Sequence, residues 1–192
     1  MVKEVVEFLQ PKSGQLFLDA TVGSGGHARE ILKLTGLDGK VLGIDWDEEA
    51  LALAKENLKE FGDRAILFRE NFVNLADTLA EKEIVEVDGA LFDLGVSSHQ
   101  LSRPERGFSF REEGPLDMRM DRRRQLSAAA IVNRYSAREL EELIRENGGE
   151  RWAKRIARSI VETREKKEIA TTLQLAKIVV DRKSTRLNSS HT

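Results

Sequence analysis

Short apolar runs alternate with helix-like segments through the first half of the chain. Mostly apolar runs, typical of buried strands, occur at 15–20, 40–45, 65–68 and 87–94. Apolar positions recur with a helical period at 2–10, 27–34, 47–58 and 73–82. Strands that alternate with helices in this way form a parallel sheet with helices on both faces. We therefore expect an α/β fold.

The pattern changes after residue 94. Residues 95–126 show no sustained periodicity and contain several glycines and prolines, which is typical of a lid or a binding element in a compact domain. Beyond them, Ser136 and Glu139 have the spacing of a capping box and begin a helix that ends at 147–149. Two further helices are expected over 150–164 and from 171 onwards. The second half is therefore expected to be mostly helical.

Composition excludes several classes of protein. Apolar residues make up 40% of the chain and charged residues 33%, as in globular domains, and no apolar run approaches the roughly 18 residues of a membrane span. The acidic residues near the N-terminus do not fit a secretory signal. The chain has no cysteine and three histidines, so we expect no metal centre, and a cytoplasmic location.

Charge is distributed unevenly between the two halves. Residues 1–100 carry 10 Lys or Arg against 19 Asp or Glu, a net charge of −9, whereas residues 101–192 carry 21 against 14, a net charge of +7. A basic half often faces a polyanion. A solvated helical surface would give the same numbers, and charge alone favours that second interpretation.

A glycine-rich turn follows the first predicted strand and begins a helix. It contains Gly23, Gly25 and Gly26, and Asp45 ends the second strand 22 residues after Gly23. Glycines let a ligand approach the backbone, and a carboxylate at the end of the second strand can accept both hydroxyls of a ribose. The sequence therefore predicts an adenosine-binding site at the carboxyl ends of the strands.

Two ligands fit this outline, a nicotinamide dinucleotide and S-adenosylmethionine. The third glycine of the dinucleotide pattern is missing, because Ala28 and Arg29 follow His27. Asp19, which ends the first strand, would repel a pyrophosphate but suits the cationic side of S-adenosylmethionine. These two features favour S-adenosylmethionine, and a NAD-dependent oxidoreductase stays as the alternative.

Asp93 ends the fourth predicted strand, where such sheets place catalysis. The amino group of a cytosine is a poor nucleophile, because its lone pair is delocalised into the ring. A carboxylate that accepts one of its N–H groups concentrates electron density on the nitrogen. This chemistry makes Asp93 the candidate catalytic residue, although an aspartate here could also cap the following turn.

Several longer strings carry a family resemblance. They are DATVGSGGH at 19–27, DLGVSS at 93–98, ERGFSF at 105–110, GPLDMRMD at 114–121, and GGER at 148–151 with AKRIA at 153–157. Over roughly residues 1–181, the chain resembles the bacterial ribosomal RNA small-subunit methyltransferase H family. That family uses S-adenosylmethionine to methylate N4 of a cytidine in 16S rRNA of the small ribosomal subunit.

The resemblance implies a partial Rossmann-like methyltransferase sheet of four strands with a mostly helical insertion. It implies a cofactor-binding core at 1–102 and part of a substrate-recognition insertion at 103–181. The residues that match the family's cofactor contacts are Gly25, Gly26, His27, Asp45, Phe72, Asp93 and Gln100. The partner it implies is 16S rRNA, without a membrane or a metal.

Basic residues of the insertion are arranged as an RNA contact would require. Arg151, Lys154, Arg155 and Arg158 fall at i, i+3, i+4 and i+7 and share one helical face. The preceding segment interleaves arginines with aromatic residues, which suits phosphate contact and base stacking. The further candidate RNA contacts are Arg106, Phe108 and Arg119. For any single arginine a solvated surface is the simpler explanation, and a non-catalytic RNA-binding fragment stays as an alternative function.

The sequence departs from the family at both ends. Family members have residues before the position of Met1 and continue well past residue 181, whereas 182–192 do not resemble the family. We therefore expect a fragment truncated at both ends, with a disordered tail at 182–192. The fourth strand would then be an open apolar edge, and the chain would be marginally stable, prone to association and weakly active or inactive. The residues do not determine an oligomeric state, and a homodimer is left open.

Overall fold

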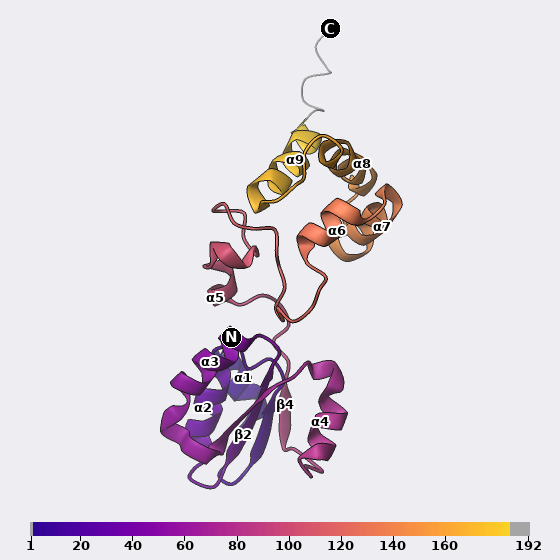
Figure 1. Cartoon of the computed structure of the whole chain (residues 1–192). Coiled ribbons are helices and arrows are strands. Elements are labelled where there is room, and N and C mark those ends of the chain that lie inside the picture. Colours follow the sequence, from indigo (N-terminus) through magenta and orange to yellow (C-terminus); the bar gives the residue numbers. More distant parts are fainter. Residues whose placement is uncertain (1, 185–192) are drawn as a thin grey trace. The chain divides into compact units, whose positions relative to one another are not determined.

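A computed structural model describes residues 2–184 of the chain, with side chains described as far as residue 181. The chain divides into two compact units, Met1–Gly95 and Val96–Thr192 (Figure 1). This division falls at Gly95, and the predicted boundary between domains at residue 102 stays a prediction. Residues 182–184, the start of the predicted disordered tail, are instead the last residues of a helix, and 185–192 lie outside the described residues.

The first unit is built on a parallel four-stranded sheet in the order β3-β2-β1-β4. The strands are β1 (Leu16–Asp19), β2 (Lys40–Asp45), β3 (Ala65–Arg69) and β4 (Gly89–Leu91). The predicted α/β fold is therefore confirmed. Within residues 2–184, β4 pairs with β1 alone and forms an edge of the sheet.

The fourth strand is shorter than the apolar run at 87–94 predicted. The backbone N–H of Asp93 donates to Thr21 Oγ1 at 2.7 Å, so it is not available to a strand ladder. At the other end, the carboxylate of Asp88 accepts the backbone N–H of Leu16 at 2.8 Å. A side chain therefore takes up the backbone N–H that follows β4, whereas before the strand the backbone N–H of Asp88 still donates to Leu16 O at 2.8 Å.

Helices cover both faces of this sheet (Figure 1). On one face, Phe17 and Val41 pack with residues of α2 and α3, and on the other, Leu18 and Leu42 pack with residues of α4. The carboxylate of Asp47 accepts the N–H of Glu49 at 3.1 Å and caps the start of α3. The helical segments of this unit are α1 (Val2–Leu9), α2 (Gly26–Leu34), α3 (Glu48–Asn57), η1 (Lys59–Arg64), η2 (Phe72–Asn74) and α4 (Leu75–Glu81).

The second unit is helical, as predicted. Its elements are α5 (Ser98–Leu101), η3 (Pro104–Arg106), α6 (Ala128–Arg134), α7 (Ala137–Gly148), α8 (Ala153–Arg164) and α9 (Thr172–Ser184). The predicted capping box is present, because Ser136 and Glu139 exchange hydrogen bonds at the start of α7. Gly149 ends that helix at φ +59, a conformation that favours glycine.

The segment that the sequence left without periodicity is ordered by contacts with the start of α9. Leu116 N donates to Ala170 O at 2.9 Å, and Thr172 N donates to Gly114 O at 3.0 Å. A Cβ at Gly114 would lie 1.9 Å from the carbonyl oxygen of Pro104, so the two backbones approach too closely for any side chain. This segment is therefore a folded part of the second unit.

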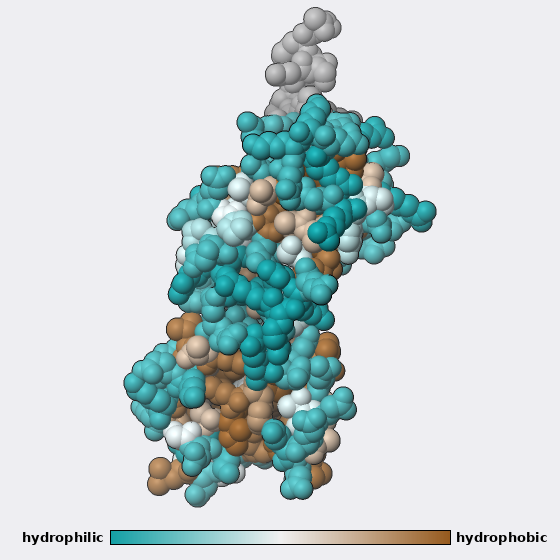
Figure 2. Space-filling model, in the orientation of Figure 1, coloured by the Kyte–Doolittle hydropathy of each residue, from teal (hydrophilic) through white to brown (hydrophobic). Residues whose placement is uncertain are grey.

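Surface hydropathy differs between the units. In the view of Figure 2, hydrophobic side chains gather over the first unit, and hydrophilic residues predominate over the second. Exposed apolar residues of the first unit include Phe8, Phe92 and Leu94. Within the described residues, every helix falls short of the length and apolarity that crossing a bilayer requires.

Candidate functional site

Three aspartates lie at one edge of the sheet in the first unit. Asp19 and Asp45 end β1 and β2, and Asp93 follows β4 by two residues. Parallel pairing aligns these strand ends, with Asp19 opposite Gly43 and Leu91. This is the edge at which parallel α/β sheets bind their ligands.

The glycine-rich turn is held in place by Asp45. Asp45 Oδ2 accepts the N–H of Gly23 at 2.9 Å, and its Oδ1 accepts the N–H of Asp47 at 2.9 Å. Each carboxylate oxygen keeps a second lone pair, which leaves Asp45 able to accept ribose hydroxyls as well. Burial raises the pKa of Asp45, and these two backbone hydrogen bonds oppose the rise. The sequence did not reveal this bracing role.

Gly25 needs to be glycine for two reasons. Its φ is +86, and a Cβ there would meet the side chain of Leu58 at 3.0 Å. The helix α2 begins immediately afterwards at Gly26, which has open space around its missing Cβ. The turn therefore presents bare backbone at the start of a helix.

Asp19 is a buried carboxyl group with an incomplete set of partners. Its side chain has no exposed surface, its Oδ1 accepts the N–H of Thr21 at 3.3 Å, and its Oδ2 has no partner in the described structure. Burial raises the pKa of Asp19 to about 7, and the negative charges of Asp45 and Asp93 contribute to the rise. A cationic ligand at this edge would stabilise the ionised carboxylate.

His27 and Asp93 face each other across the same edge. His27 Nδ1 lies 3.9 Å from Asp93 Oδ2, and the His27 side chain is 15% exposed against 42% for Asp93. His27 Nε2 is buried and has no partner in the described structure. An unpaired buried polar atom costs about 1–3 kcal/mol, so Asp19 Oδ2 and His27 Nε2 together fit a site that a polar, cationic ligand completes.

Two phenylalanines lie near the same strand ends. Phe72 begins η2 after β3 and meets Phe92 edge to face, with ring centroids 6.0 Å apart. Phe72 is 37% exposed and Phe92 47% exposed, so both offer ring surface to a ligand. The predicted contact of Phe72 with an adenine stays a prediction, and Phe92 is a neighbour that sequence reasoning did not single out.

Three of the four predicted basic residues lie on α8 and are exposed, whereas Arg151 is exposed in the turn before the helix, which begins at Ala153 and not at 150 as expected. Arg151, Lys154, Arg155 and Arg158 all reach solvent, whereas Ile156 and Ile160 are buried. No carboxylate of the described residues forms an ion pair with these four basic side chains.

On the neighbouring helix α7, two arginines form ion pairs with glutamates of the same helix. Arg138 pairs with Glu142 at 2.8 Å, and Arg145 pairs with Glu141 at 2.5 Å. Opposite charges at i and i+4 of a helix stabilise each other by about 0.2–0.5 kcal/mol. Among the described residues, the four basic side chains at 151–158 lack this compensation, and their contact with RNA stays a prediction.

Comparison with known proteins identifies the family. A model described as the MraW methylase family matches residues 1–191, which extends past residue 181, where the resemblance was expected to end. The chain belongs to this family. The resemblance seen in the sequence is thereby confirmed, because curated relatives carry the name ribosomal RNA small subunit methyltransferase H.

The relatives are longer than this chain. The protein from Geotalea uraniireducens is 48% identical over 179 residues, which are 93% of this chain and 57% of that protein. The protein from Trichlorobacter lovleyi is 52% identical over 179 residues, again 93% of this chain and 57% of that protein. The chain therefore spans just over half the length of the curated relatives it matches.

Solved structures show partial likeness. A putative rRNA methylase from Clostridium thermocellum is 23% identical with a TM-score of 0.42, over 51% of this chain and 55% of that chain. NSun6 from Pyrococcus horikoshii is 24% identical with a TM-score of 0.43, over 49% of this chain and 23% of that chain.

Gln100, a predicted cofactor contact, has a clear local role in the second unit. Its side chain is 5% exposed, and its Oε1 accepts the N–H of Ser97 at 2.9 Å. Ser97 Oγ in turn accepts the N–H of Gln100, which completes a capping box at the start of α5. Its contact with a cofactor stays a prediction.

The structure does not support Arg106 as an RNA contact. Arg106 is 1% exposed, and its Nη2 donates to the carbonyl oxygens of Arg119 and Met120 at 3.1 and 3.3 Å. Its guanidinium lies 5.7 Å from the ring centroid of Phe108, which is half-buried. Arg106 therefore organises the loop. Sequence spacing cannot distinguish a buried guanidinium from a solvated one, so the sequence did not predict the burial of Arg106.

Arg119 is also engaged within the loop. It forms two hydrogen bonds with the carboxylate of Asp117, at 2.6 and 2.9 Å, and donates to the carbonyl oxygen of Arg124 at 2.8 Å. Its side chain stays 27% exposed. The contact of Arg119 with RNA stays a prediction. Its guanidinium has fewer N–H donors left for RNA than the basic side chains at 151–158.

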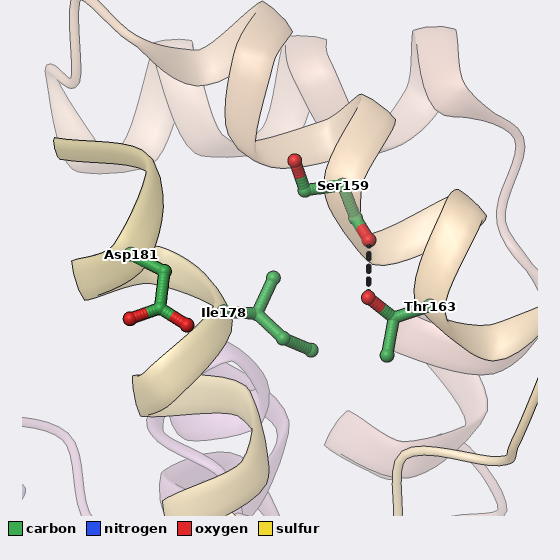
Figure 3. Close-up of a pocket in the computed structure, with 4 residues that line it drawn as sticks. All are labelled: Ser159, Thr163, Ile178 and Asp181. Carbon is green, nitrogen blue, oxygen red and sulfur yellow. Dashed lines mark hydrogen bonds between the residues drawn. The ribbon is translucent and has the colours of Figure 1, made fainter. Parts of the chain in front are cut away.

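A small pocket of about 180 Å³ lies between α8 and α9 (Figure 3). It is lined by Ser159, Thr163, Ile178 and Asp181. Thr163 Oγ1 donates to Ser159 O at 2.7 Å, and Ser159 Oγ donates to Arg155 O at 3.0 Å. Both hydroxyl groups are therefore satisfied by the helix backbone, and none of the predicted site residues lines this pocket.

Proposed function

We propose that the protein transfers a methyl group from S-adenosylmethionine to N4 of a cytidine in 16S rRNA of the small ribosomal subunit. Membership of the MraW methylase family and the names of the curated relatives support this proposal. The observation that carries it is the cluster of Asp19, His27 and Asp93, which leaves two buried polar atoms for a cationic ligand to complete.

Different residues of the first unit would contact different parts of S-adenosylmethionine. The bare backbone of Gly25 and Gly26 admits the ligand, and the free lone pairs of Asp45 accept the ribose hydroxyls. Phe72 borders the adenine, and Asp19 faces the ammonium group. S-adenosylmethionine supplies an electrophilic methyl group on its sulfonium when bound.

Asp93 carries the proposed chemistry on the RNA side. Its carboxylate accepts one N–H of the cytosine amino group, concentrates electron density on that nitrogen, and takes the proton that the nitrogen loses as its new bond to carbon forms. Thr21 Oγ1 holds the backbone of Asp93 through the 2.7 Å hydrogen bond. The half-exposed carboxylate is thereby fixed at the strand end and still reachable by a base.

The second unit would hold the RNA. The exposed and unpaired side chains of Arg151, Lys154, Arg155 and Arg158 suit contact with phosphate groups, and Arg119 and Phe108 add to the same unit. A cytoplasmic location accords with this partner and stays a prediction.

Calorimetry tests the cofactor. The 192-residue chain should bind S-adenosylmethionine and S-adenosylhomocysteine and should not bind NAD. Binding of NAD alone would favour an oxidoreductase and overturn the proposal. Asp45→Ala should weaken the binding of S-adenosylmethionine, because the ribose hydroxyls lose their acceptor.

Methyl transfer tests the reaction. Transfer of a labelled methyl group to assembled small subunits and to naked 16S rRNA should show a modified cytidine, and Asp93→Ala should abolish it. A chain that binds RNA and S-adenosylmethionine but transfers no methyl group would be a non-catalytic RNA-binding module. Normal turnover by Asp93→Ala would refute the role given to this residue.

A further inference from the structure

Trp152 lies between two arginines at the start of α8. The guanidinium carbon of Arg151 is 5.2 Å from the centroid of the indole ring, and that of Arg155 is 5.3 Å from it. Both distances fall within the range of cation–π attraction. One aromatic ring therefore holds two of the four basic side chains of this face.

Packing against the core of the second unit fixes the indole ring of Trp152. Trp152 is half-buried and packs against the core cluster that contains Ile156 and Ile160. Its backbone N–H donates to Glu150 Oε1 at 3.0 Å, which fixes the main chain at the start of the helix. The indole is therefore a rigid platform built into the core of the second unit.

The two guanidinium groups remain available for a ligand. Neither Arg151 nor Arg155 forms an ion pair with a carboxylate of the described residues, in contrast to Arg138 and Arg145 on α7. A guanidinium that lies over a ring keeps N–H donors free at its edges. Free arginine side chains lose rotamer freedom when they bind, and a platform that already restricts them reduces that cost.

We propose that Trp152 is a positioning residue that holds Arg151 and Arg155 as a two-guanidinium binding surface for the phosphate groups of single-stranded RNA. The inference rests on the proposed function and adds to it the device that orients the RNA-binding arginines. Trp152 acts on affinity through the arrangement of the two side chains, and the arginines supply the charge.

This division of roles gives different results for different variants. Arg151→Gln with Arg155→Gln should weaken RNA binding and reduce the slope of log affinity against log salt by about 1.4, because two phosphate contacts on a single strand are lost. Trp152→Leu should leave that slope unchanged, because the charges remain. It should nevertheless weaken binding about three- to tenfold, because both side chains must be ordered on binding.

The assay is fluorescence anisotropy of a fluorescein-labelled single-stranded RNA oligonucleotide with the full chain, over a series of KCl concentrations. Arg138→Gln with Arg145→Gln removes the same charge from α7 and is the matched control, which should change affinity less than twofold. Trp152→Phe keeps a ring and should recover most of the affinity that Trp152→Leu loses.

A second measurement does not depend on the folding of the leucine variant. The chain has two tryptophans, so Trp46→Phe leaves Trp152 as the single emitter, and RNA should change its emission. Wild-type affinity in Trp152→Leu, or unchanged emission, would overturn the inference. If the double glutamine variant still loses affinity in that case, the proposed RNA partner stands without the positioning role.

Discussion

The buried carboxyl group of Asp19 gives a sharp test of the site, through the substitution Asp19→Asn. Its pKa is raised from the usual 3.8 to about 7, chiefly by burial. Because the folded protein holds this proton more tightly than the unfolded chain, folding is favoured at low pH and loses stability as pH rises towards 7. Each unit of raised pKa corresponds to about 1.4 kcal/mol.

The size of the effect follows from these two pKa values. Between pH 5 and pH 8, the contribution of Asp19 to the free energy of unfolding should fall by about 2–3 kcal/mol. Asparagine carries no charge at either pH and avoids this loss. The free energy of unfolding of Asp19→Asn, relative to the wild type, should therefore rise by about that amount between the two pH values.

Urea unfolding of the first unit measures this difference. Trp46 follows β2, and Trp152 belongs to the second unit, so Trp152→Phe makes fluorescence a reporter of the first unit. If the free energies of unfolding of Asp19→Asn and the wild type differ by the same amount at pH 5 and at pH 8, the raised pKa of Asp19 is refuted. Under the proposed function, binding of S-adenosylmethionine at pH 6.5 should also release a proton from Asp19, and calorimetry in buffers of different ionisation heat should show no such release in Asp19→Asn.

Three further substitutions probe the turn, the strand ends and the loop. Thr21→Val removes an acceptor for the backbone after β4 and should cost about 1 kcal/mol in urea unfolding, whereas Thr21→Ser should keep most of the stability. Gly25→Ala should destabilise the protein by about 1–2 kcal/mol at its positive φ, whereas Gly26→Ala should retain stability and weaken S-adenosylmethionine binding in calorimetry. Arg119 lowers the pKa of Asp117, so the ionised carboxylate stabilises the fold above the unfolded pKa. The stability advantage of Asp117 over Asp117→Asn, about 1 kcal/mol, should persist at pH 6 and decline as pH falls below the usual carboxyl pKa of 3.8 and through the lower folded pKa.

Hydrophobic periodicity predicted all four strands, although only β1 and β2 are mostly buried, whereas β3 is half-buried and β4 is partly exposed. The second strand, 40–45, was predicted at its observed bounds, Lys40–Asp45. The fourth was predicted too long, because its end is determined by the hydrogen bond from Asp93 to Thr21, residues far apart in sequence. Periodicity records burial and does not record which side chain takes a backbone N–H.

The helical half was predicted less completely. Ala128–Arg134 forms α6, a helix that the sequence analysis did not single out, because its seven residues are fewer than the roughly 11 that a reliable periodicity needs. Its signal was Ser127, whose hydroxyl accepts the N–H of Ala130 at 3.2 Å. The burial of Arg106 could not be predicted either, since its acceptors are backbone carbonyls at 119 and 120 that only the folded loop brings to it.

The acidic and basic halves of the sequence correspond to differently charged sites in the two units. Asp19, Asp45 and Asp93 gather negative charge at one sheet edge, which attracts a cationic ligand and repels phosphate groups. The basic surface of α8 has the opposite preference, and its side chains are not neutralised by carboxylates of the described residues. Under the proposed function, a cationic cofactor and a polyanionic substrate would therefore bind different parts of the chain. Added salt should consequently weaken RNA binding far more than it weakens S-adenosylmethionine binding, because the buried carboxylates are screened much less than exposed arginines. Equal salt sensitivity for the two ligands would contradict this separation.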